Sequence, residues 1–213
     1  MMLSKSIITG FTCIALLGLS SCASDLTDAR SAAPKSTPSK SPDGFLPPAA
    51  SPKVISKSTK LAKDKHGMPT YKSLSDRTRY VRTTAFSHME NEPGAPGRLN
   101  ASGTILKYGK VRSAAADWSV YPLGTVFRVK GLPHTYVVDD YGSALVGTNT
   151  IDIFKPNLSL MRKWGTRKTE ITVIQWGSFQ RSLKLLKGRK KYPHCYKMYI
   201  GCKKQLGNSY ASN

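Results

Sequence analysis

The chain has 213 residues, of which 39% are apolar, and this limits it to one ordinary domain with long appendages. It carries 33 lysines and arginines against 12 aspartates and glutamates, giving a formal net charge of +21. A surplus of this size indicates an anionic neighbour such as nucleic acid, anionic lipid or an anionic wall polymer.

Residues 1–22 have the pattern of an export signal. Lys5 forms a short positive region, residues 7–19 are largely apolar but too short to span a bilayer, and small residues precede Cys22. This pattern predicts a bacterial lipoprotein in which Cys22 becomes the N-terminus and carries the acyl chains that anchor the protein in a membrane. An ordinary secretory signal that contains a cysteine is the alternative. In both cases the protein is exported, so we expect no nucleic-acid partner.

Residues 23–75 are predicted to form a long disordered tether. The stretch is rich in serine, proline, lysine and alanine, and six prolines interrupt its candidate helices: Pro34, Pro38, Pro42, Pro47, Pro48 and Pro52. A cationic segment with prolines stays extended and would hold an anchored domain away from the lipid surface. Binding of an anionic polymer by its lysines is the alternative.

Residues 76–178 have the texture of a compact, mainly β domain, with short apolar runs separated by glycine and proline. Strands are expected at residues 80–86, 105–111, 126–129, 135–138, 151–154 and 169–176, and a helix at residues 156–164. Residues 90–97, with two prolines and two glycines, are expected to be a loop. Six short strands with one or two short helices predict a small closed barrel, because closure hides the sheet edges.

Residues 179–213 form a basic C-terminal extension, with nine basic residues between positions 181 and 204 and no acidic ones. Cys195 and Cys202 in an exported chain most simply form a disulfide that closes a small loop. A metal site that includes His194 is the alternative, but it needs a further ligand. The basic residues either contact anionic lipid or wall polymer, or form a solvated surface.

Three carboxylates lie within fourteen residues of one another. Asp139 and Asp140 follow an apolar, β-branched run, and Asp152 lies between two isoleucines, so all three are expected on strands. An ionised carboxylate on a packed strand must be paired, hydrogen-bonded or shifted in pKa, which makes the cluster a candidate functional site. Asp139 should face away from Asp140 and be exposed, because neighbouring side chains of a strand point to opposite faces.

Several short motifs occur in a fixed order along the mainly β domain: Thr-Ala-Phe at 84–86, Ala-Ser-Gly-Thr at 101–104, Ala-Asp at 116–117, Pro-Leu-Gly-Thr at 122–125, Asp-Tyr-Gly-Ser-Ala-Leu-Val-Gly at 140–147, Ile-Asp-Ile-Phe at 151–154 and Trp-Gly at 164–165. This order resembles the three-aspartate (3D) domain, which also forms the catalytic part of the membrane-bound lytic transglycosylase A family.

The resemblance implies a six-stranded double-psi β-barrel that acts on peptidoglycan. It implies that Asp117, Asp140 and Asp152 are the three aspartates of the family, with Asp152 at the position of its catalytic acid and base. The chain departs from the usual pattern at residues 141, 143, 145 and 146, where it has tyrosine, serine, leucine and valine in place of threonine, glycine, isoleucine and lysine.

A lytic transglycosylase needs only one carboxyl group, whereas ordinary glycoside hydrolysis takes two. Asp152 is the expected acid and base. It must then be protonated near neutral pH, so we expect its pKa to be raised by burial or by a neighbouring carboxylate, with Asp140 as the group that sets it. The alternative is structural: Asp117 and Asp140 cap turns, and Asp152 is a hydrogen-bonded strand aspartate.

Other side chains are candidates for supporting roles. The hydroxyls of Thr84, Ser102 and Thr104 would donate hydrogen bonds to the carboxylates or to a sugar, or they are ordinary strand hydroxyls. Tyr141 and Trp118 would stack on a sugar ring, or they are buried core aromatics.

The expected function is that of a peptidoglycan lytic transglycosylase cleaving the β-1,4 bond between N-acetylmuramic acid and N-acetylglucosamine, with a 1,6-anhydro product and neither metal nor cofactor. Ala23 after Cys22 is not an aspartate-type retention signal, so the anchor is expected on the periplasmic face of the outer membrane. The alternatives are a non-catalytic, expansin-like lipoprotein that binds or loosens the wall, and an adaptor that uses its basic tail.

Overall fold

The structure is a computed structural model that describes residues 46–90 and 97–210, except for the side chains of residues 208–210. The expected export signal with Cys22, the tether as far as residue 45, the middle of the loop at 91–96 and the last three residues lie outside the described residues. The described residues belong to one compact unit. Within them, no helix is both long and apolar enough to cross a bilayer.

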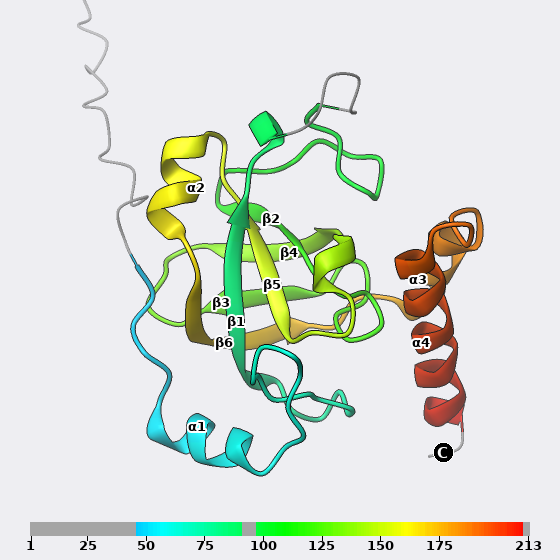
Figure 1. Cartoon of the computed structure of the whole chain (residues 1–213), viewed down its shortest axis with the longest axis horizontal. Helices are drawn as coiled ribbons and strands as arrows, with labels where there is room; N and C mark the ends of the chain where they lie inside the picture. Colours follow the sequence, from blue (N-terminus) through cyan, green and yellow to red (C-terminus); the bar gives the residue numbers. More distant parts are fainter. Residues whose placement is uncertain (1–45, 91–96, 211–213) are drawn as a thin grey trace, which may run out of the picture. The chain divides into compact units, whose positions relative to one another are not determined.

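Six strands form a closed barrel, seen in Figure 1: β1 (Thr78–Phe86), β2 (Val111–Ala115), β3 (Val126–Val129), β4 (Thr135–Asp140), β5 (Thr150–Phe154) and β6 (Arg167–Gln175). Their order around the barrel is β1-β5-β2-β4-β3-β6. The pairs β1–β5 and β2–β4 are parallel, and the other neighbours are antiparallel. The chain therefore forms the mainly β domain that the pattern of apolar runs predicts.

Apolar and aromatic side chains fill the barrel by alternating along its strands. In β1, Val81 and Thr83 are fully buried, whereas Arg82 between them is half-buried. Across β3 and β4, the rings of Phe127 and Tyr136 stack with their centroids 5.4 Å apart. Large buried rings remove much apolar surface from water, so these contacts contribute strongly to stability.

One expected strand, at residues 105–111, is wrong. Ile105 is exposed, and the strand lies instead at β2, where Ser113, Ala114 and Ala115 are buried between β4 and β5. Intrinsic β-propensity favours the isoleucine-containing stretch, but the crowded interior of a six-stranded barrel accepts the small side chains of β2. The other strands begin and end within two residues of the expected positions.

Residues 46–75 fold against the barrel, so the expectation of a tether is wrong for this stretch. Helix α1 (Pro52–Thr59) has Pro52 in its first turn, where a helix loses no hydrogen bond to proline. Beyond α1, Met68 and Tyr71 are buried. The backbone N–H of Asn149 donates to the Asp64 carboxylate at 2.7 Å and joins this stretch to the barrel.

Arg79 of β1 connects the N-terminal stretch with the barrel. Its guanidinium lies among the rings of Tyr71, Tyr121 and Trp176, at 4.7, 5.1 and 4.7 Å from their centroids. It also donates to two backbone carbonyl oxygens at 2.6 and 2.7 Å. Because ring faces attract cations, this cage accommodates an arginine that is only 1% exposed.

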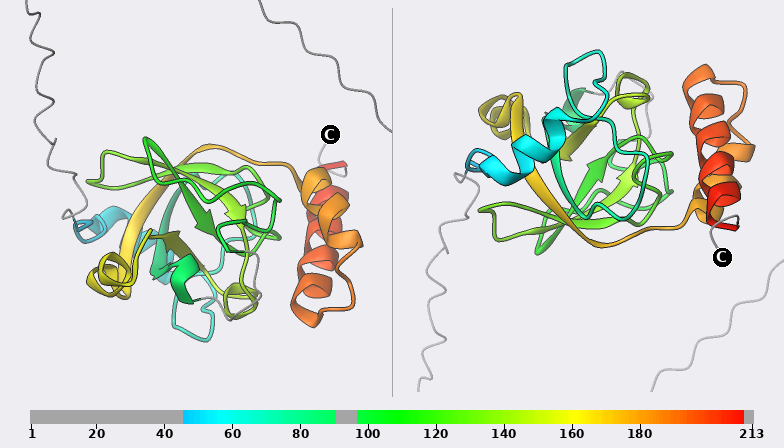
Figure 2. Two further views of the ribbon diagram at one scale, coloured as in Figure 1. Left: turned by 90° about the horizontal axis from the view of Figure 1, so that it is seen from above. Right: turned by 90° about the horizontal axis from the view of Figure 1, so that it is seen from below.

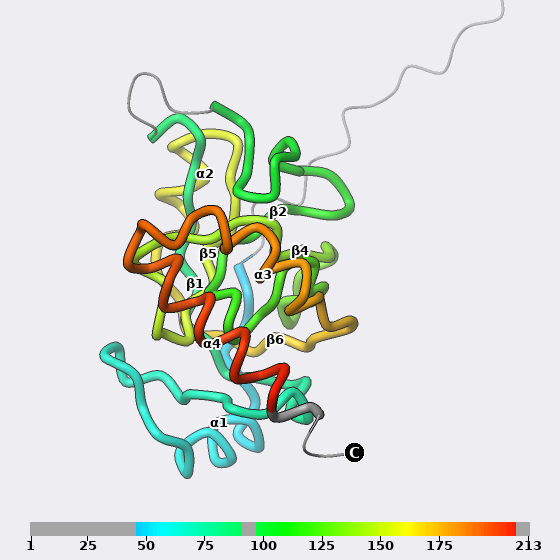
Figure 3. The backbone as a smooth tube through the Cα atoms, turned by 90° about the vertical axis from the view of Figure 1, so that its right-hand side faces the viewer, coloured from blue at the N-terminus to red at the C-terminus, as the bar shows by residue number. Residues whose placement is uncertain are grey.

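The C-terminal extension forms a helical hairpin beside the barrel, consisting of α3 (Phe179–Lys187) and α4 (Pro193–Tyr210) (Figure 2; Figure 3). Its side chains Leu186 and Met198 share one core cluster with Trp118 of the barrel. With α1 and α2 (Leu158–Trp164), the described residues contain four α-helices, more than the one or two expected, besides the short 3₁₀ turns η2 (His88–Glu90) and η3 (Ser143–Leu145).

The expected disulfide between Cys195 and Cys202 is wrong, because both residues are buried free cysteines. They lie two turns apart on the continuous helix α4, about 10 Å along the axis, and a disulfide needs Cα atoms within about 7 Å. Both thiols face the barrel. Cys195 donates to the Tyr141 hydroxyl and Cys202 to the Trp118 carbonyl oxygen, each at 3.3 Å.

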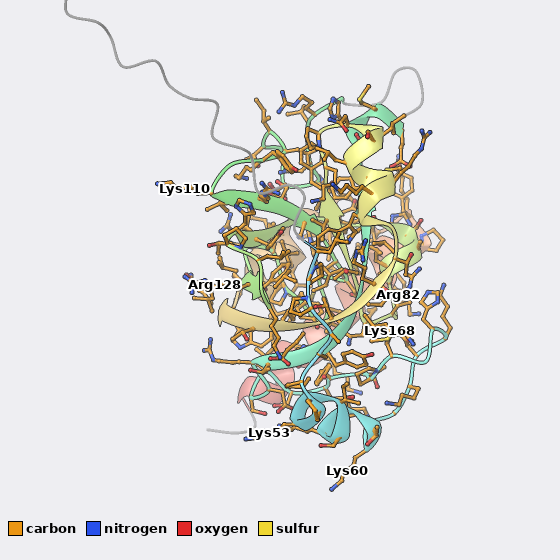
Figure 4. All side chains as sticks on the ribbon, turned by 90° about the vertical axis from the view of Figure 1, so that its left-hand side faces the viewer. Lys53, Lys60, Arg82, Lys110, Arg128 and Lys168 are labelled. Carbon is orange, nitrogen blue, oxygen red and sulfur yellow. The ribbon has the colours of Figure 1, made fainter. Side chains whose placement is uncertain are left out.

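Basic side chains spread over the outside of the domain. Figure 4 labels six of them, on α1 and directly after it, on β1, β3 and β6, and in the loop before β2: Lys53, Lys60, Arg82, Lys110, Arg128 and Lys168. On the antiparallel pair β1–β6, Arg82 lies directly opposite Lys168. Like charges opposite each other destabilise a sheet, so an anionic partner would relieve this repulsion.

We predict that Met68→Ala destabilises the domain by about 2–5 kcal/mol, because Met68 is fully buried and its truncation leaves a cavity. Denaturant unfolding followed by tryptophan fluorescence measures the loss. Met89→Ala is the matched control, since Met89 is 57% exposed and should change stability by less than about 0.5 kcal/mol. Equal, negligible effects of both substitutions would show that residues 46–75 are a removable tether.

Candidate functional site

A pocket of about 620 Å³ opens where several strands end together. Its floor includes the last residues of β1, β2 and β4, namely Phe86, Ala115 and Asp140, together with Asp152 of β5. The loop at residues 97–106 and the turn η3 form parts of its wall. The strand ends thus present two carboxylates to an accessible cavity.

Asp140 and Asp152 come together because β2 runs between β4 and β5. Both residues pair with Ala115, Asp140 in the parallel ladder and Asp152 in the antiparallel one. A bulge between Ala114 and Ala115 passes over Asp139 and brings Asp140 opposite Ala115. With neighbouring strands about 4.8 Å apart, the two aspartates flank Ala115 in the same pocket.

Asp152 occupies a poorly solvated position. Its Oδ1 atom is buried and accepts no hydrogen bond from the described residues. Burial raises the pKa of Asp152 to about 6; the Thr84 hydroxyl opposes this rise and the charge of Glu90 adds to it. The charge of Asp140 contributes less than either, so the expectation that Asp140 sets this pKa is wrong. Desolvation is the main cause.

Asp140 is half-buried, as Asp152 is, but its carboxylate accepts more hydrogen bonds. Its Oδ1 atom accepts the backbone N–H groups of Ala101 at 3.0 Å and Tyr141 at 2.9 Å. Burial still raises the pKa of Asp140 to about 6, with a smaller contribution from Asp139 and an opposing one from Arg189. The carboxylate therefore fixes the loop at residues 97–106 as well as lining the pocket.

Asp139 is buried, which corrects the expectation that it is exposed. Its Oδ2 atom accepts from the Lys107 ammonium at 2.7 Å and the Ser113 hydroxyl at 2.8 Å. Burial raises its pKa, and these two partners counter the rise. The bulge in the β2–β4 ladder turns Asp139 toward Ser113, and Asp139 does not line the pocket.

Asp117 lies away from the other two aspartates of the motif, beside a separate pocket of about 350 Å³. Its Oδ1 atom accepts the backbone N–H and the hydroxyl of Ser119 at 2.9 and 2.6 Å. Its Oδ2 atom accepts the backbone N–H of Gly147 at 2.7 Å. This carboxylate holds the chain after η3 against the barrel and does not reach the pocket of Asp140 and Asp152.

The three candidate hydroxyls have different positions. Thr84 on β1 pairs directly with Asp152 on β5. Ser102 and Thr104 instead donate to the Asn100 side-chain oxygen at 2.8 and 3.2 Å, within the loop at residues 97–106. They stabilise this wall of the pocket, and neither lines it.

The two candidate aromatic residues also differ. Trp118 is fully buried, donates from Nε1 to the backbone oxygen of Asp140 at 2.9 Å, and meets the Tyr141 ring edge-on at 5.0 Å. Stacking of Trp118 on a sugar is therefore wrong, and the core alternative holds. Tyr141 lines the pocket and is half-buried. Burial and the Cys195 thiol raise its pKa to about 12, so it is neutral.

Among the pocket residues that were not expected site residues, three have polar side chains: His88, Asn100 and Arg189. Asn100, followed by small residues and Gly103, has the composition of a hydrogen-bonded turn, so local sequence contains a signal for it. Arg189 lies between α3 and α4, and only the packing of the hairpin brings it to the pocket.

His194, considered as a metal ligand, lies against the rings of Tyr141 and Tyr192. In the described part of the chain, no group of three or more histidine, cysteine, aspartate or glutamate side chains is arranged to hold a metal ion. The polar side chains that line the pocket include the two carboxylates, His88, Tyr141 and Arg189.

Comparison with known proteins gives one family match. The family model of the 3D domain matches residues 112–176, which contain β3 to β6 and the three aspartates of the motif. Among solved structures, the chain is similar to MltA from Escherichia coli, described as having a unique lytic transglycosylase fold. The identity is 21% over 41% of this chain and 30% of that chain, with a TM-score of 0.32. A search of the curated proteins found no match.

We predict that Asp152→Asn stabilises the domain at pH 8 and not at pH 4. The folded-state pKa of Asp152 is raised from 3.8 to about 6, so its burial costs stability only when the group is ionised. This cost is absent well below pH 4, grows between about pH 4 and pH 6, where the unfolded chain ionises before the folded one, and levels off above about pH 6 at about 3 kcal/mol at most. Urea unfolding of wild type and variant at both pH values measures the difference.

Asp64→Asn is the control of opposite sign. Three backbone N–H groups hold the pKa of Asp64 below its ordinary value, so its ionised form stabilises the fold above that value and the contribution is lost as the pH falls. This variant should lose stability at pH 8. A destabilised Asp152→Asn at pH 8 would contradict the desolvated state of that carboxyl group.

Proposed function

We propose that the chain, whose residues 112–176 match the family model of the 3D domain, is a peptidoglycan lytic transglycosylase. The observation that carries the proposal is the pair Asp140 and Asp152, on either side of Ala115 in one open pocket, each with a pKa raised to about 6. The bond cleaved is the β-1,4 bond between N-acetylmuramic acid and N-acetylglucosamine, and the product is a 1,6-anhydro sugar.

One carboxyl group is sufficient for this reaction, because the nucleophile belongs to the substrate. Protonated Asp152 gives its proton to the glycosidic oxygen as the bond from C1 of N-acetylmuramic acid breaks. The 6-hydroxyl of the same sugar attacks C1, and the Asp152 carboxylate accepts the hydroxyl proton. The acid is thereby restored, and no water is consumed.

Asp152 suits this role better than Asp140. A general acid must hold a proton until it releases it to the substrate. Hydrogen bonds donated to the ionised carboxylate stabilise that form and so oppose its protonation. Asp140 accepts two backbone N–H groups, whereas Asp152 Oδ1 has no partner among the described residues. We assign Asp140 to shaping the pocket and stabilising charge there, and Asp117 to positioning the turn after η3.

The proposal extends to the architecture. We take the barrel to be of the double-psi type and the domain to span residues 76–178. Two parallel pairs, β1–β5 and β2–β4, support this assignment, since each joins strands that are not consecutive in the sequence. The longer span includes β1, which completes the barrel between β5 and β6.

The cellular setting is also a proposal. We place the protein in the cell envelope, anchored through acyl chains on Cys22, on the periplasmic face of the outer membrane. The lipoprotein-type pattern of residues 1–22 supports export. The net charge of +21 suits an anionic wall polymer or lipid, which would concentrate the protein near its substrate.

We predict that Asp152→Asn abolishes the release of 1,6-anhydromuropeptides from purified sacculi, with a loss of at least about 100-fold. Mass spectrometry of the soluble products measures the activity, and pelleting with sacculi measures binding, which should persist. Asp76→Asn is the control, because Asp76 does not line the pocket. If wild-type protein pellets with sacculi and releases no anhydro product, the non-catalytic, wall-binding alternative replaces the enzymatic one.

We also predict an acidic pH dependence. Because Asp152 acts in its protonated form and its pKa is about 6, kcat/KM should fall about tenfold per pH unit above pH 6. Initial rates of anhydro-product release between pH 5 and pH 8.5 provide the test. A rate that rises across this range would assign the acid role to another group.

A further inference from the structure

The C-terminal hairpin places one charged side chain in the pocket. Arg189 lies in the short connection after α3, and its backbone N–H donates to the Leu186 carbonyl oxygen at 2.9 Å. The Tyr192 N–H in turn donates to the Arg189 carbonyl oxygen at 3.0 Å. Two backbone hydrogen bonds thus fix the position from which the side chain extends.

The barrel holds this hairpin firmly. Cys195 and Cys202 of α4 are fully buried and donate to barrel atoms, and the Trp118 N–H donates to the sulfur of Met198 at 3.4 Å. On α3, the Ser182 hydroxyl oxygen accepts the N–H of Leu123 at 2.9 Å. Arg189 is therefore held at the pocket by a packed element, which favours a defined binding role over a chance surface position.

The guanidinium retains most of its binding capacity. Nη1 donates to the Tyr141 hydroxyl at 3.3 Å, and the guanidinium carbon lies 5.7 Å from the centre of the Tyr141 ring. Tyr141 is neutral, so it orients the cation without cancelling its charge. In the described part of the chain Arg189 forms no salt bridge, although it lies in the field of Asp140. A guanidinium has five N–H donors, and several remain for a ligand.

Arg189 adds a positively charged side chain to a pocket that also contains two carboxyl groups. Among the described residues that line the pocket, it is the one lysine or arginine, and Asp140 and Asp152 are the acidic ones. A guanidinium binds a carboxylate through two parallel hydrogen bonds, and this pairing is stronger and more directional than a neutral contact. The pocket thus has one location suited to an anionic group and another suited to proton transfer.

We infer that Arg189 is a substrate-binding residue that recognises a carboxylate on the saccharide next to the bond that Asp152 cleaves. This inference rests on the proposed function. The carboxylate belongs either to the lactyl group of a peptide-free muramic acid residue or to the peptide attached there. Arg189 therefore favours the binding of wall glycan that carries such a carboxylate over the binding of an uncharged glycan of N-acetylglucosamine.

Binding measurements in an Asp152→Asn background test the inference without turnover. The full-length chain is titrated calorimetrically with three saccharides of equal length: a peptide-free oligomer containing muramic acid, the same oligomer with its peptide, and an uncharged N-acetylglucosamine oligomer. Adding Arg189→Gln should weaken at least one carboxylate ligand about 10- to 100-fold and the uncharged oligomer by less than about twofold. The more strongly affected carboxylate ligand identifies the source of the group.

Lys190→Gln is the matched control, because it removes the same charge from the same connection and Lys190 is exposed and outside the pocket. It should leave all three affinities unchanged. Arg189→Lys keeps the charge without the two-pronged geometry and should lie between wild type and Arg189→Gln. If Arg189→Gln fails to fold, Arg189→Lys provides the test of the inference in its place.

Equal losses for charged and uncharged saccharides would overturn the inference, because they would show that Arg189 only supports Tyr141. Unchanged affinities, or no binding of any saccharide by the Asp152→Asn chain, would overturn it as well. Failure of the proposed function has a separate signature, since it appears as an absence of anhydro products from wild type whatever the binding selectivity.

Discussion

The withdrawal of two carboxylates from water is the constraint on which the rest of the site depends. Asp140 and Asp152 both flank Ala115, and burial raises the pKa of each. A larger residue than alanine would fill the space between them, and a regular ladder without the bulge would present Asp139 in place of Asp140. A closed barrel with a well-packed interior offsets the cost of holding these groups there.

Local sequence was sufficient for much of the fold. Apolar runs bounded by glycine and proline located β3 at its observed residues and the other predicted strands to within two residues, except for residues 105–111. The motif at residues 140–147 and the isoleucines around Asp152 identified the two carboxylates that meet in the pocket. These features are recoverable because turns and strand alternation depend on nearby residues.

Features that depend on distant contacts were not recoverable. Pro52 is compatible with a helix only as a first-turn residue, and the burial of Met68 requires the barrel. The spacing of Cys195 and Cys202 suggested a disulfide that closes a loop, because the spacing alone does not indicate that both residues lie on one continuous helix. Arg189 carries no local signal at all. The weight of the two expected causes of the raised pKa of Asp152 was likewise not recoverable, since desolvation by packing is the main cause and the charge of Asp140 contributes little.

The position of β1 has a consequence for how the domain is delimited. The family match begins at residue 112, whereas β1 covers Thr78–Phe86 and pairs with both β5 and β6. A fragment cut at the limits of the match would lack β1. The edge of β5 that pairs with β1 in a parallel ladder and the edge of β6 that pairs with it in an antiparallel ladder would then have unpaired backbone groups. Such open edges recruit strands from other molecules. Aggregation of that fragment would then result from the incomplete closure of its barrel. It would say nothing about the solubility of the intact protein.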